Sequence, residues 1–166
     1  TMQLAKDFFL SPEKSLKRKF LQVLIAFQLE HRFNKQQIFQ MYANEVPLGQ
    51  RGSFSIDGFG EAAQAYFGKD VSQLDLPECA LLAGVIQSPS WLNPFRHPDR
   101  AIERRNVVLD AMIETGDITR AQAAAAKAAP LGLDAGAFDA GEAPYFVDLV
   151  RDQLIQRLGD TDYNQQ

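Results

Sequence analysis

Apolar residues recur at helical intervals along almost the whole chain. In SLKRKFLQVLIAFQLE, residues 15–30, the positions of Phe20, Val23, Leu24 and Phe27 predict a helix with a broad apolar surface. Further helices are predicted for KQQIFQMYANEV, EAAQAYFGK, LPECALLAGVIQ, residues 99–115, an alanine-rich stretch that Pro130 ends, and YFVDLVRDQLIQRLG. Strand-like alternation is nearly absent, so we expect a mainly α fold.

The boundaries of these helices are marked by local signals. Capping residues three positions apart precede three of them, at Asn34 and Gln37, Asp75 and Glu78, and Thr119 and Gln122. Gly68 is expected to end the helix before it. The stretch PLGQRGSFSIDGFG is rich in glycine and serine and predicts a long loop that could form one wall of a site.

The length of 166 residues is typical of one domain with a hydrophobic core. We expect a helical domain over 1–130, a linker over 131–143 because of its composition, and a further helical segment over 144–166. The chain begins with TMQLAKDFFL, which resembles the middle of an element. We therefore expect that the sequence is a piece of a longer protein.

Charge is unevenly distributed along the chain. The net charge is −4, but residues 1–69 contain nine Lys/Arg and six Asp/Glu, whereas residues 70–166 contain eight and fifteen. This asymmetry favours a small anionic ligand bound by the first half, and the acidic total argues against a nucleic-acid partner. One cysteine and two histidines predict neither an internal disulfide nor a metal cluster.

Two cations and an amide converge on one side of the first long helix. Arg18 and Gln22 are four residues apart and Lys19 and Gln22 three apart, so the three side chains share a face. One interpretation is that the long basic side chains lie along the helix and place their charges in water. The other is that they bind an anion. The residues alone leave both interpretations open.

Several ordered motifs resemble those of the family-51 peptidoglycan glycosyltransferases. The segments TMQLAKDFFLS, RKFLQVLIAFQLE, KQQIFQMYANEVPLGQ, GFGEAAQAYFGKDVSQLDLPECALLAGVIQSPSWLNPFRHP and ERRNVVLDAM are similar to motifs two to five, in order. APYFVDLVRDQLIQRLG resembles the segment that leads to the transpeptidase domain of class A penicillin-binding proteins. Residues 1–130 would then be the glycosyltransferase domain without its N-terminal part, and 144–166 a helix leading toward the transpeptidase.

The resemblance implies a lysozyme-like fold with two lobes and an inverting reaction that polymerises lipid II. The acceptor's sugar 4-hydroxyl attacks C1 of the donor, and undecaprenyl pyrophosphate leaves. The resemblance also implies a place at the periplasmic face of the cytoplasmic membrane, an anchor before Thr1, and other cell-wall synthesis proteins as partners. No nucleic acid is expected.

The family's functional positions carry over residue by residue. Arg18 and Lys19 match the basic pair of the third motif and Lys6 the lysine of the second, so they are expected to hold the leaving pyrophosphate. Substrate contacts are also expected for Gln3, Gln50 and Arg51. Structural support is expected from Tyr42 as a core aromatic, Asn44 as a buried amide, and Arg104 and Arg105 through ion pairs.

The sequence departs from the family pattern at two functional positions. The family's general base belongs to the first motif, upstream of Thr1, so this chain by itself is expected to be inactive and to expose apolar helix faces. Gln22 stands where the family has a second Glu, and the loss of that charge puts a divalent cation (Mg²⁺ or Mn²⁺) in doubt. Gln22 is a natural variant, an inactivating change, or the sign of a branch that positions the diphosphate without the carboxylate.

Gln22 also leaves other functions open. A non-catalytic homologue that binds lipid II or scaffolds a synthesis complex is the main alternative. A lysozyme-type hydrolase shares the fold but needs a pair of carboxylates across a sugar, and the motifs contain no such pair.

Overall fold

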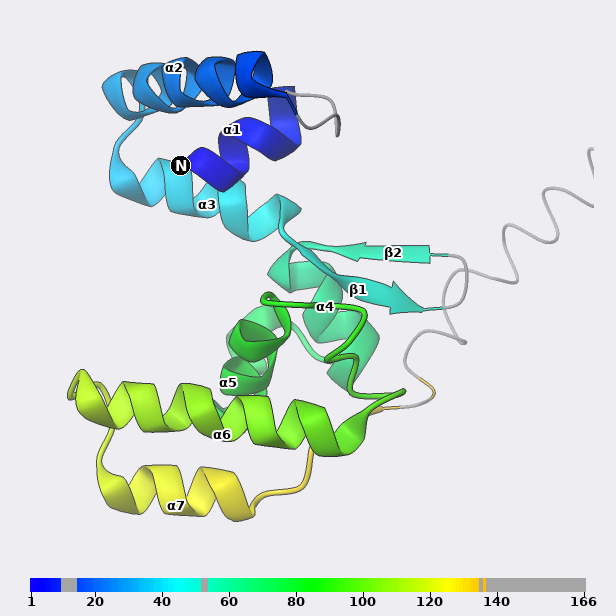
Figure 1. Ribbon diagram of the computed structural model, residues 1–166. Helices are drawn as coiled ribbons and strands as arrows, with labels where there is room; N and C mark the ends of the chain where they lie inside the picture. Colours follow the sequence, from blue (N-terminus) through cyan, green and yellow to red (C-terminus); the bar gives the residue numbers. More distant parts are fainter. Residues whose placement is uncertain (10–14, 52–53, 135, 137–166) are drawn as a thin grey trace, which may run out of the picture.

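The computed structural model describes residues 1–9, 15–51, 54–134 and 136, which form two lobes (Figure 1). The upper lobe consists of α1 (Met2–Phe9), α2 (Leu16–Arg32) and α3 (Lys35–Glu45). The lower lobe consists of β1 (Pro47–Arg51), β2 (Phe54–Asp57), α4 (Gly58–Phe67), the 3₁₀ helix η1 (Val71–Gln73), α5 (Leu76–Val85), α6 (Pro98–Glu114) and α7 (Arg120–Ala128). The mainly α fold predicted from the sequence is confirmed.

The predicted helix boundaries are largely confirmed. All three capping boxes are present, each with a side chain that accepts from the backbone N–H three residues on and a second side chain that accepts in return. Ser15 caps α2 by accepting a 3.1 Å hydrogen bond from the backbone N–H of Arg18. Gly68, in the left-handed region with φ 63°, ends α4.

The stretch predicted as a loop is instead a β-hairpin followed directly by a helix. β1 and β2 pair antiparallel, with Gln50 opposite Ser55 and Arg51 opposite Phe54. The register shifts between Pro47 and Gly49, and Gly49 has φ 140°. The loop prediction was wrong because the glycines and serines that suggested it lie within or beside two very short strands.

The hairpin is held in place by hydrogen bonds to α4 and to the segment before α6. The hydroxyl of Tyr66 on α4 donates to the Leu48 carbonyl at 2.6 Å, and the Asn93 amide donates to the Gln50 carbonyl at 3.2 Å. In return the Arg51 guanidinium donates to the Ala65 carbonyl of α4 at 2.9 Å. A two-stranded hairpin is marginal by itself, so these long-range bonds account for its presence here.

Each lobe has its own core, and Tyr42 joins the two. The lower core contains Leu48, Ile56 and Tyr66 together with the buried faces of α4 and α5. The upper core is smaller and consists of Leu4, Ala5, Ala26, Leu29 and Ile38. Tyr42 on α3 packs against both cores. The lobes are therefore connected through α3.

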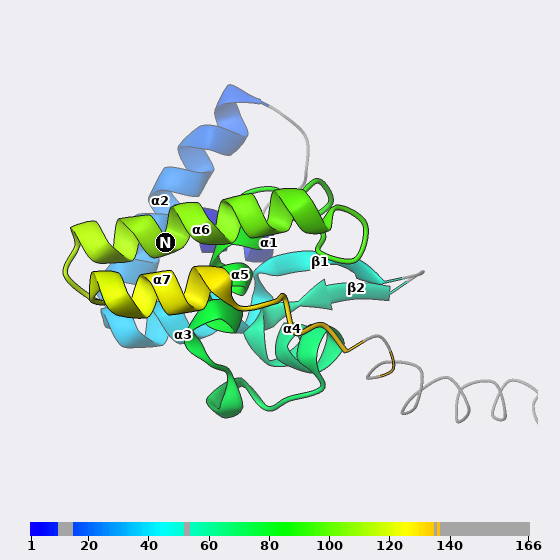
Figure 2. The same cartoon turned by 90° about the horizontal axis from the view of Figure 1, so that it is seen from below.

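The chain returns from α7 to the centre of the lower lobe. α6 and α7 lie side by side in both views, joined by the ion pair of Lys127 with Asp110 (Figures 1 and 2). After α7, Leu131 and Leu133 pack against the lower core, and the backbone N–H of Asp134 donates to the Tyr66 carbonyl at 2.8 Å. The first four residues of the predicted linker 131–143 are thus part of the lobe. The rest of that linker, apart from Gly136, and the predicted helix 144–166 lie outside the described residues.

α2 buries one narrow face and exposes a wide apolar one. Gln22, Ala26 and Leu29 are buried toward α1 and α3. On the opposite side a stripe of large apolar residues is exposed, with Phe20 at 66% and Phe27 at 73% of their full accessible area. The same stripe includes Leu16, Val23 and Leu24. The expectation that helices of this chain expose apolar faces is confirmed for α2.

We expect the Tyr66 hydroxyl to stabilise the fold, and to do so in a pH-dependent way. Tyr66→Phe should lower the free energy of unfolding by about 1–2 kcal/mol at neutral pH, because the buried Leu48 carbonyl loses its donor. Burial raises the pKa of Tyr66 from 10.0 to about 12. A pKa that is higher in the folded state means that this contribution is complete below the unfolded pKa and is lost as the pH rises toward the folded one.

Urea unfolding of wild type and Tyr66→Phe from about pH 8 to about pH 11 checks this. The free energy of unfolding of wild type should exceed that of Tyr66→Phe by less above about pH 10 than below it. A difference in the free energy of unfolding that stays constant across this range would contradict the raised pKa of Tyr66 in the folded protein.

Candidate functional site

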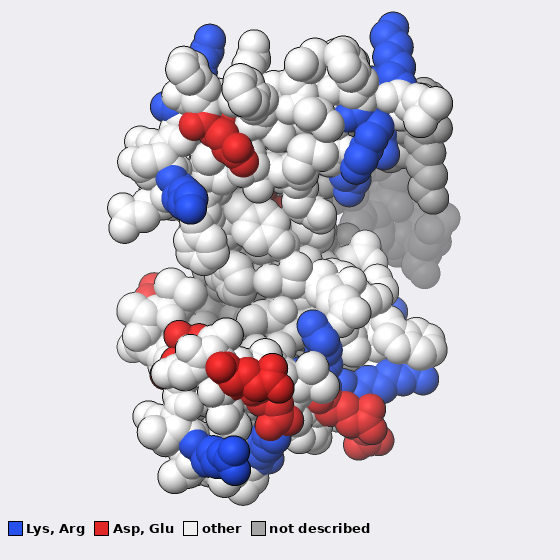
Figure 3. Space-filling view, turned by 60° about the vertical axis from the view of Figure 1, so that its left-hand side comes forward, with Lys and Arg blue, Asp and Glu red and all other residues white. Residues whose placement is uncertain are grey.

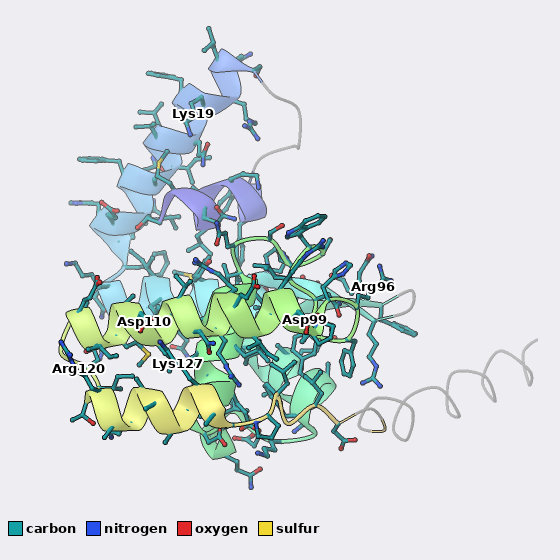
Figure 4. All side chains as sticks on the ribbon, turned by 60° about the horizontal axis from the view of Figure 1, so that its bottom comes forward. Lys19, Arg96, Asp99, Asp110, Arg120 and Lys127 are labelled. Atoms are coloured by element: carbon teal, nitrogen blue, oxygen red, sulfur yellow. The ribbon has the colours of Figure 1, made fainter. Side chains whose placement is uncertain are left out.

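Arg18 and Lys19 lie in the first turns of α2, on either side of the buried Gln22 face. Lys19 is exposed and Arg18 half-buried. The Nε atom of Arg18 is enclosed, yet no described residue accepts its hydrogen. The other N–H groups of the Arg18 guanidinium are the donors that can bind an anion. Figure 4 places Lys19 on this helix, in the upper lobe.

Gln22 ties α2 to α1. Its side chain is only 5% exposed, and Nε2 donates a 2.7 Å hydrogen bond to the Met2 carbonyl in the first turn of α1. A carboxylate has no hydrogen to give to that carbonyl unless it is protonated. The amide therefore performs a structural task that an ionised glutamate at this position could not perform. This bond could not be predicted from the sequence, because its acceptor is a backbone atom.

α1 places Lys6 and Gln3 in the same lobe as the Arg18–Lys19 pair. Leu4 and Ala5 of α1 are buried in the upper core beside Ala26 of α2. Lys6 is half-buried and Gln3 is exposed. The structure thus brings the predicted pyrophosphate-binding cations onto two packed helices, α1 and α2. On the face shown in Figure 3, basic side chains are more abundant than acidic ones over the upper lobe.

The structure places Gln50 and Arg51 on a different lobe from these cations. Both belong to β1, and Gln50 is exposed. Arg51 bonds to the Ala65 carbonyl, and its guanidinium carbon lies 4.8 Å from the centre of the Phe95 ring. These contacts give Arg51 a structural role in the lower lobe. A substrate contact for either residue stays a prediction.

The predicted supporting residues Tyr42 and Asn44 have different outcomes. Tyr42 packs between the two cores, as expected for a core aromatic. Asn44 was expected to be a buried amide, but its side chain is exposed. The backbone of Asn44, in contrast, is tightly packed. A Cβ on Gly58 would lie 2.4 Å from the Asn44 carbonyl oxygen. Gly58, with φ 80°, allows α3 and α4 to meet this closely.

Arg105 is a buried structural cation, although its partners are not the carboxylates that the sequence suggested. It is 1% exposed and donates to the carbonyls of Lys127 and Ala129, each at 2.9 Å. These carbonyls belong to the end of α7, where the last turn of a helix lacks intrahelical partners. Burial lowers the pKa of Arg105, and Asp75 acts in the opposite direction.

Arg104 lies beside α5. A Cβ on Gly84 would be 3.0 Å from the Cγ of Arg104, and the Nε of Arg104 is enclosed without a partner among the described residues. The expected ion pairs of Arg104 and Arg105 are absent from the described part of the chain.

A pocket of about 620 Å³ opens at the junction of α2 and α3. It is lined by Thr1, Glu30, Phe33, Asn34, Lys35, Ile38, Phe39 and Tyr42. Of the predicted site residues only Tyr42 belongs to it. The cations of α1 and α2 therefore form a surface separate from this pocket.

The described residues do not fit a divalent cation at position 22. In this part of the chain no three His, Cys, Asp or Glu side chains are close enough together to hold a metal ion. The Gln22 amide is turned to the Met2 carbonyl, and Mg²⁺ and Mn²⁺ prefer oxygen ligands that include carboxylates. We therefore derive no step of the reaction through a metal.

Comparison with known proteins identifies similar sequences and similar structures. A family model described as Transglycosylase matches residues 1–113. The chain is 42% identical over 164 residues to penicillin-binding protein 1A of Escherichia coli and 44% identical over 161 residues to that of Vibrio cholerae. These alignments cover 98% and 96% of this chain and 19% of each relative.

A crystal structure of penicillin-binding protein 1A from Haemophilus influenzae superposes with a TM-score of 0.59 at 36% identity. The match covers 78% of this chain and 18% of that one. The chain thus spans about one fifth of the length of the curated relatives it matches. Together these matches confirm the family resemblance that the motifs predicted.

Proposed function

Since the chain belongs to the transglycosylase family, we propose that it acts in a peptidoglycan glycosyltransferase that polymerises lipid II into glycan strands. In the proposed reaction the acceptor 4-hydroxyl forms a bond to C1 of the donor with inversion, and undecaprenyl pyrophosphate leaves. The observation that carries this proposal is the Arg18–Lys19 pair in the first turns of α2, beside the buried Gln22 that is bonded to α1.

The leaving group explains why cations are needed. As the bond from C1 to the phosphate oxygen breaks, negative charge gathers on the pyrophosphate, and fixed positive groups lower the energy of that transition state. The guanidinium of Arg18 can bind two phosphate oxygens at once, whereas Lys19 supplies a compact charge on a flexible stem. Lys6 of α1 adds a third cation in the same lobe.

The proton of the attacking hydroxyl requires a base, and the resemblance assigns that role to the family's first motif. In this proposal the cations of α1 and α2 assist the departure of the pyrophosphate. The packing of Leu4 and Ala5 with Ala26, together with the Gln22–Met2 hydrogen bond, holds the helix that carries Lys6 against the helix that carries Arg18 and Lys19.

The second candidate is a homologue that binds lipid II without polymerising it and scaffolds other cell-wall synthesis proteins. One observation favours it. The side chain at position 22, where the family has a carboxylate, is an amide occupied by the Met2 carbonyl. The cations could hold the pyrophosphate equally well in such a protein, so the two candidates differ in turnover and not in binding.

The exposed stripe of α2 supports a position at the outer face of the cytoplasmic membrane. No helix among the described residues has the length and apolar character needed to cross a bilayer. Leu16, Phe20 and Phe27 lie on the side of α2 opposite Gln22, and Phe8 and Phe9 of α1 are also exposed. An amphipathic helix with basic side chains beside an apolar face is suited to lie in the membrane interface.

We expect Arg18→Ala and Lys19→Ala in the full-length natural protein to lower lipid II polymerisation by about 10²-fold, because each removes a charge that stabilises the leaving group. Circular dichroism should show unchanged helix content. Lys17→Ala, which removes an exposed cation from the same helix, is the matched control and should polymerise normally. Arg104→Ala should mainly lower thermal stability. Normal polymer output from folded Lys19→Ala would show that the pyrophosphate is held elsewhere.

Gln22→Glu distinguishes the two candidate functions. We expect the wild-type protein to polymerise lipid II as it stands, and Gln22→Glu to change the dependence on Mg²⁺ more than the rate, because it adds a carboxylate near Arg18 and Lys19. Activity that rises from background only in Gln22→Glu would instead identify Gln22 as inactivating and favour the scaffold. Gln28→Glu adds the same charge at an exposed position of α2 and controls for net charge. A fully active wild type whose metal response is unchanged by Gln22→Glu would contradict both interpretations.

The membrane position can be measured with an environment-sensitive dye on Phe27→Cys, in full-length protein reconstituted into lipid vesicles. Cys79, which is exposed, is first replaced by serine. We expect a blue-shifted emission and quenching by brominated lipids, because Phe27 belongs to the exposed stripe. Val71→Cys on η1 in the lower lobe is the matched control. A dye at this position should show the emission of an aqueous environment and little quenching. Quenching at Phe27→Cys that is as weak as at Val71→Cys would place α2 outside the bilayer.

A further inference from the structure

The segment between α5 and α6 holds an aromatic side chain rigidly at the surface. Leu92, Asn93 and Pro94 are buried, and the Asn93 side chain accepts from the backbone N–H of Phe95 at 3.0 Å. The neighbouring Trp91 is nevertheless 58% exposed. Because the adjacent residues are anchored in the lobe, this exposure is a fixed feature of the fold, and an exposed indole in a fixed position is typical of binding surfaces.

A cation covers one face of this indole. The guanidinium carbon of Arg100 lies 3.6 Å from the centre of the Trp91 ring, and the His97 ring lies 6.0 Å away at 40°. A guanidinium at that distance shields the face it covers, so much of the exposed area of Trp91 lies on the other face and the ring edge. A flat partner can therefore stack on Trp91 while Arg100 remains beside it.

Two arginines flank the indole, with Asp99 at the same end of α6, in a lobe that has more acidic than basic residues. Arg96 is exposed, and neither Arg96 nor Arg100 forms an ion pair with a carboxylate among the described residues. Figure 4 places Arg96 and Asp99 at one end of α6 and Arg120 at the other. We call Trp91, Arg96, His97 and Arg100 the Trp91 platform. Its charge is complementary to an anionic ligand that also has a flat apolar surface.

We propose that the Trp91 platform binds the growing glycan strand. This inference rests on the proposed function, in which the product is a chain of sugars that carry peptides. A pyranose ring presents a flat face of C–H groups that stacks on an indole, and each linear peptide ends in a carboxylate that Arg96 and Arg100 can bind. The indole of the platform therefore suits the sugars of that product, and its arginines suit the peptides.

The size and place of the platform favour a strand over a protein partner. A stable protein interface buries about 800 Å² on each side, whereas a whole aromatic side chain offers at most about 250 Å², and Trp91 is only 58% exposed. The platform belongs to the lower lobe, and the Arg18–Lys19 pair to α2 in the upper lobe (Figure 1). A polymer can contact both lobes at once, so the platform would retain the strand between successive transfers.

This proposal can be tested by measuring how tightly the full-length natural protein binds soluble, uncrosslinked glycan strands. The measurement is made with strands that carry their peptides and with the same strands after the peptides are removed. Trp91→Ala should weaken binding of both kinds about tenfold, because stacking on the sugars is lost. Arg96→Ala should weaken binding of the peptide-bearing strands alone. Arg120→Ala removes an exposed cation at the far end of α6 and α7 and should bind like wild type.

The outcomes separate this proposal from the proposed function. Trp91→Ala should release shorter strands during lipid II polymerisation, because the strand is held less tightly between transfers. A protein that binds strands through Trp91 but polymerises nothing would overturn the proposed function alone. Strand binding that is equal in wild type, Trp91→Ala and Arg96→Ala would overturn the platform proposal. The proposal would also be overturned if these variants lost binding to an acidic protein partner while their binding of glycan strands stayed unchanged. Arg96 has no hydrogen-bond or ion-pair partner for its side chain among the described residues, so its variant tests the platform even if Trp91→Ala folds poorly.

Discussion

The hydrogen bond from the buried Tyr66 hydroxyl to the Leu48 carbonyl is the contact on which the lower lobe depends most. It fixes the hairpin against α4, and the room it needs explains Gly49, where a Cβ would lie 2.5 Å from the Tyr66 oxygen. The Tyr66 ring lies 5.7 Å from Phe95, which follows the anchored residues beside Trp91. The hairpin, α4 and the segment before α6 thus share one buried side chain, and the orientation of Trp91 follows from the same packing.

α2 has two faces whose chemistries match the two ends of the proposed donor. Toward α1 it presents Arg18, Lys19 and the buried Gln22, and on the other side the apolar stripe that includes Phe20 and Phe27. Lipid II has a pyrophosphate directly joined to a long hydrocarbon. A single helix with cations on one side and apolar residues on the other can therefore receive the diphosphate while it lies against the lipid that carries it. In the proposed function, this arrangement accounts for the two cations near the start of a helix with so much apolar surface.

The sequence was sufficient to predict the features that arise from local interactions. Helices and their caps were predicted correctly because the capping boxes at Asn34, Asp75 and Thr119 need only residues three positions apart. The hairpin could not be predicted, because its partners Tyr66 and Asn93 lie far along the chain. The motifs identified the cationic pair of the candidate site.

Backbone partners account for the parts of the site that the sequence did not reveal. Gln22 bonds to the Met2 carbonyl, and Arg105 bonds to carbonyls of α7, so a search for oppositely charged side chains could find neither. Asn44 was misjudged for a related reason. The close approach at that position involves its carbonyl and Gly58, while its amide is exposed.

The return of the chain to Tyr66 after α7 has a mechanical consequence. Because the Asp134 N–H is bonded to the Tyr66 carbonyl and Leu133 is packed against the lower core, tension applied to the chain beyond this point reaches α4 before it reaches α7. α4 is the helix whose tyrosine also holds the hairpin. A pull or rotation from that side would therefore be transmitted as a displacement of the hairpin and its neighbouring segment, and the helical pair α6–α7 would remain unstrained.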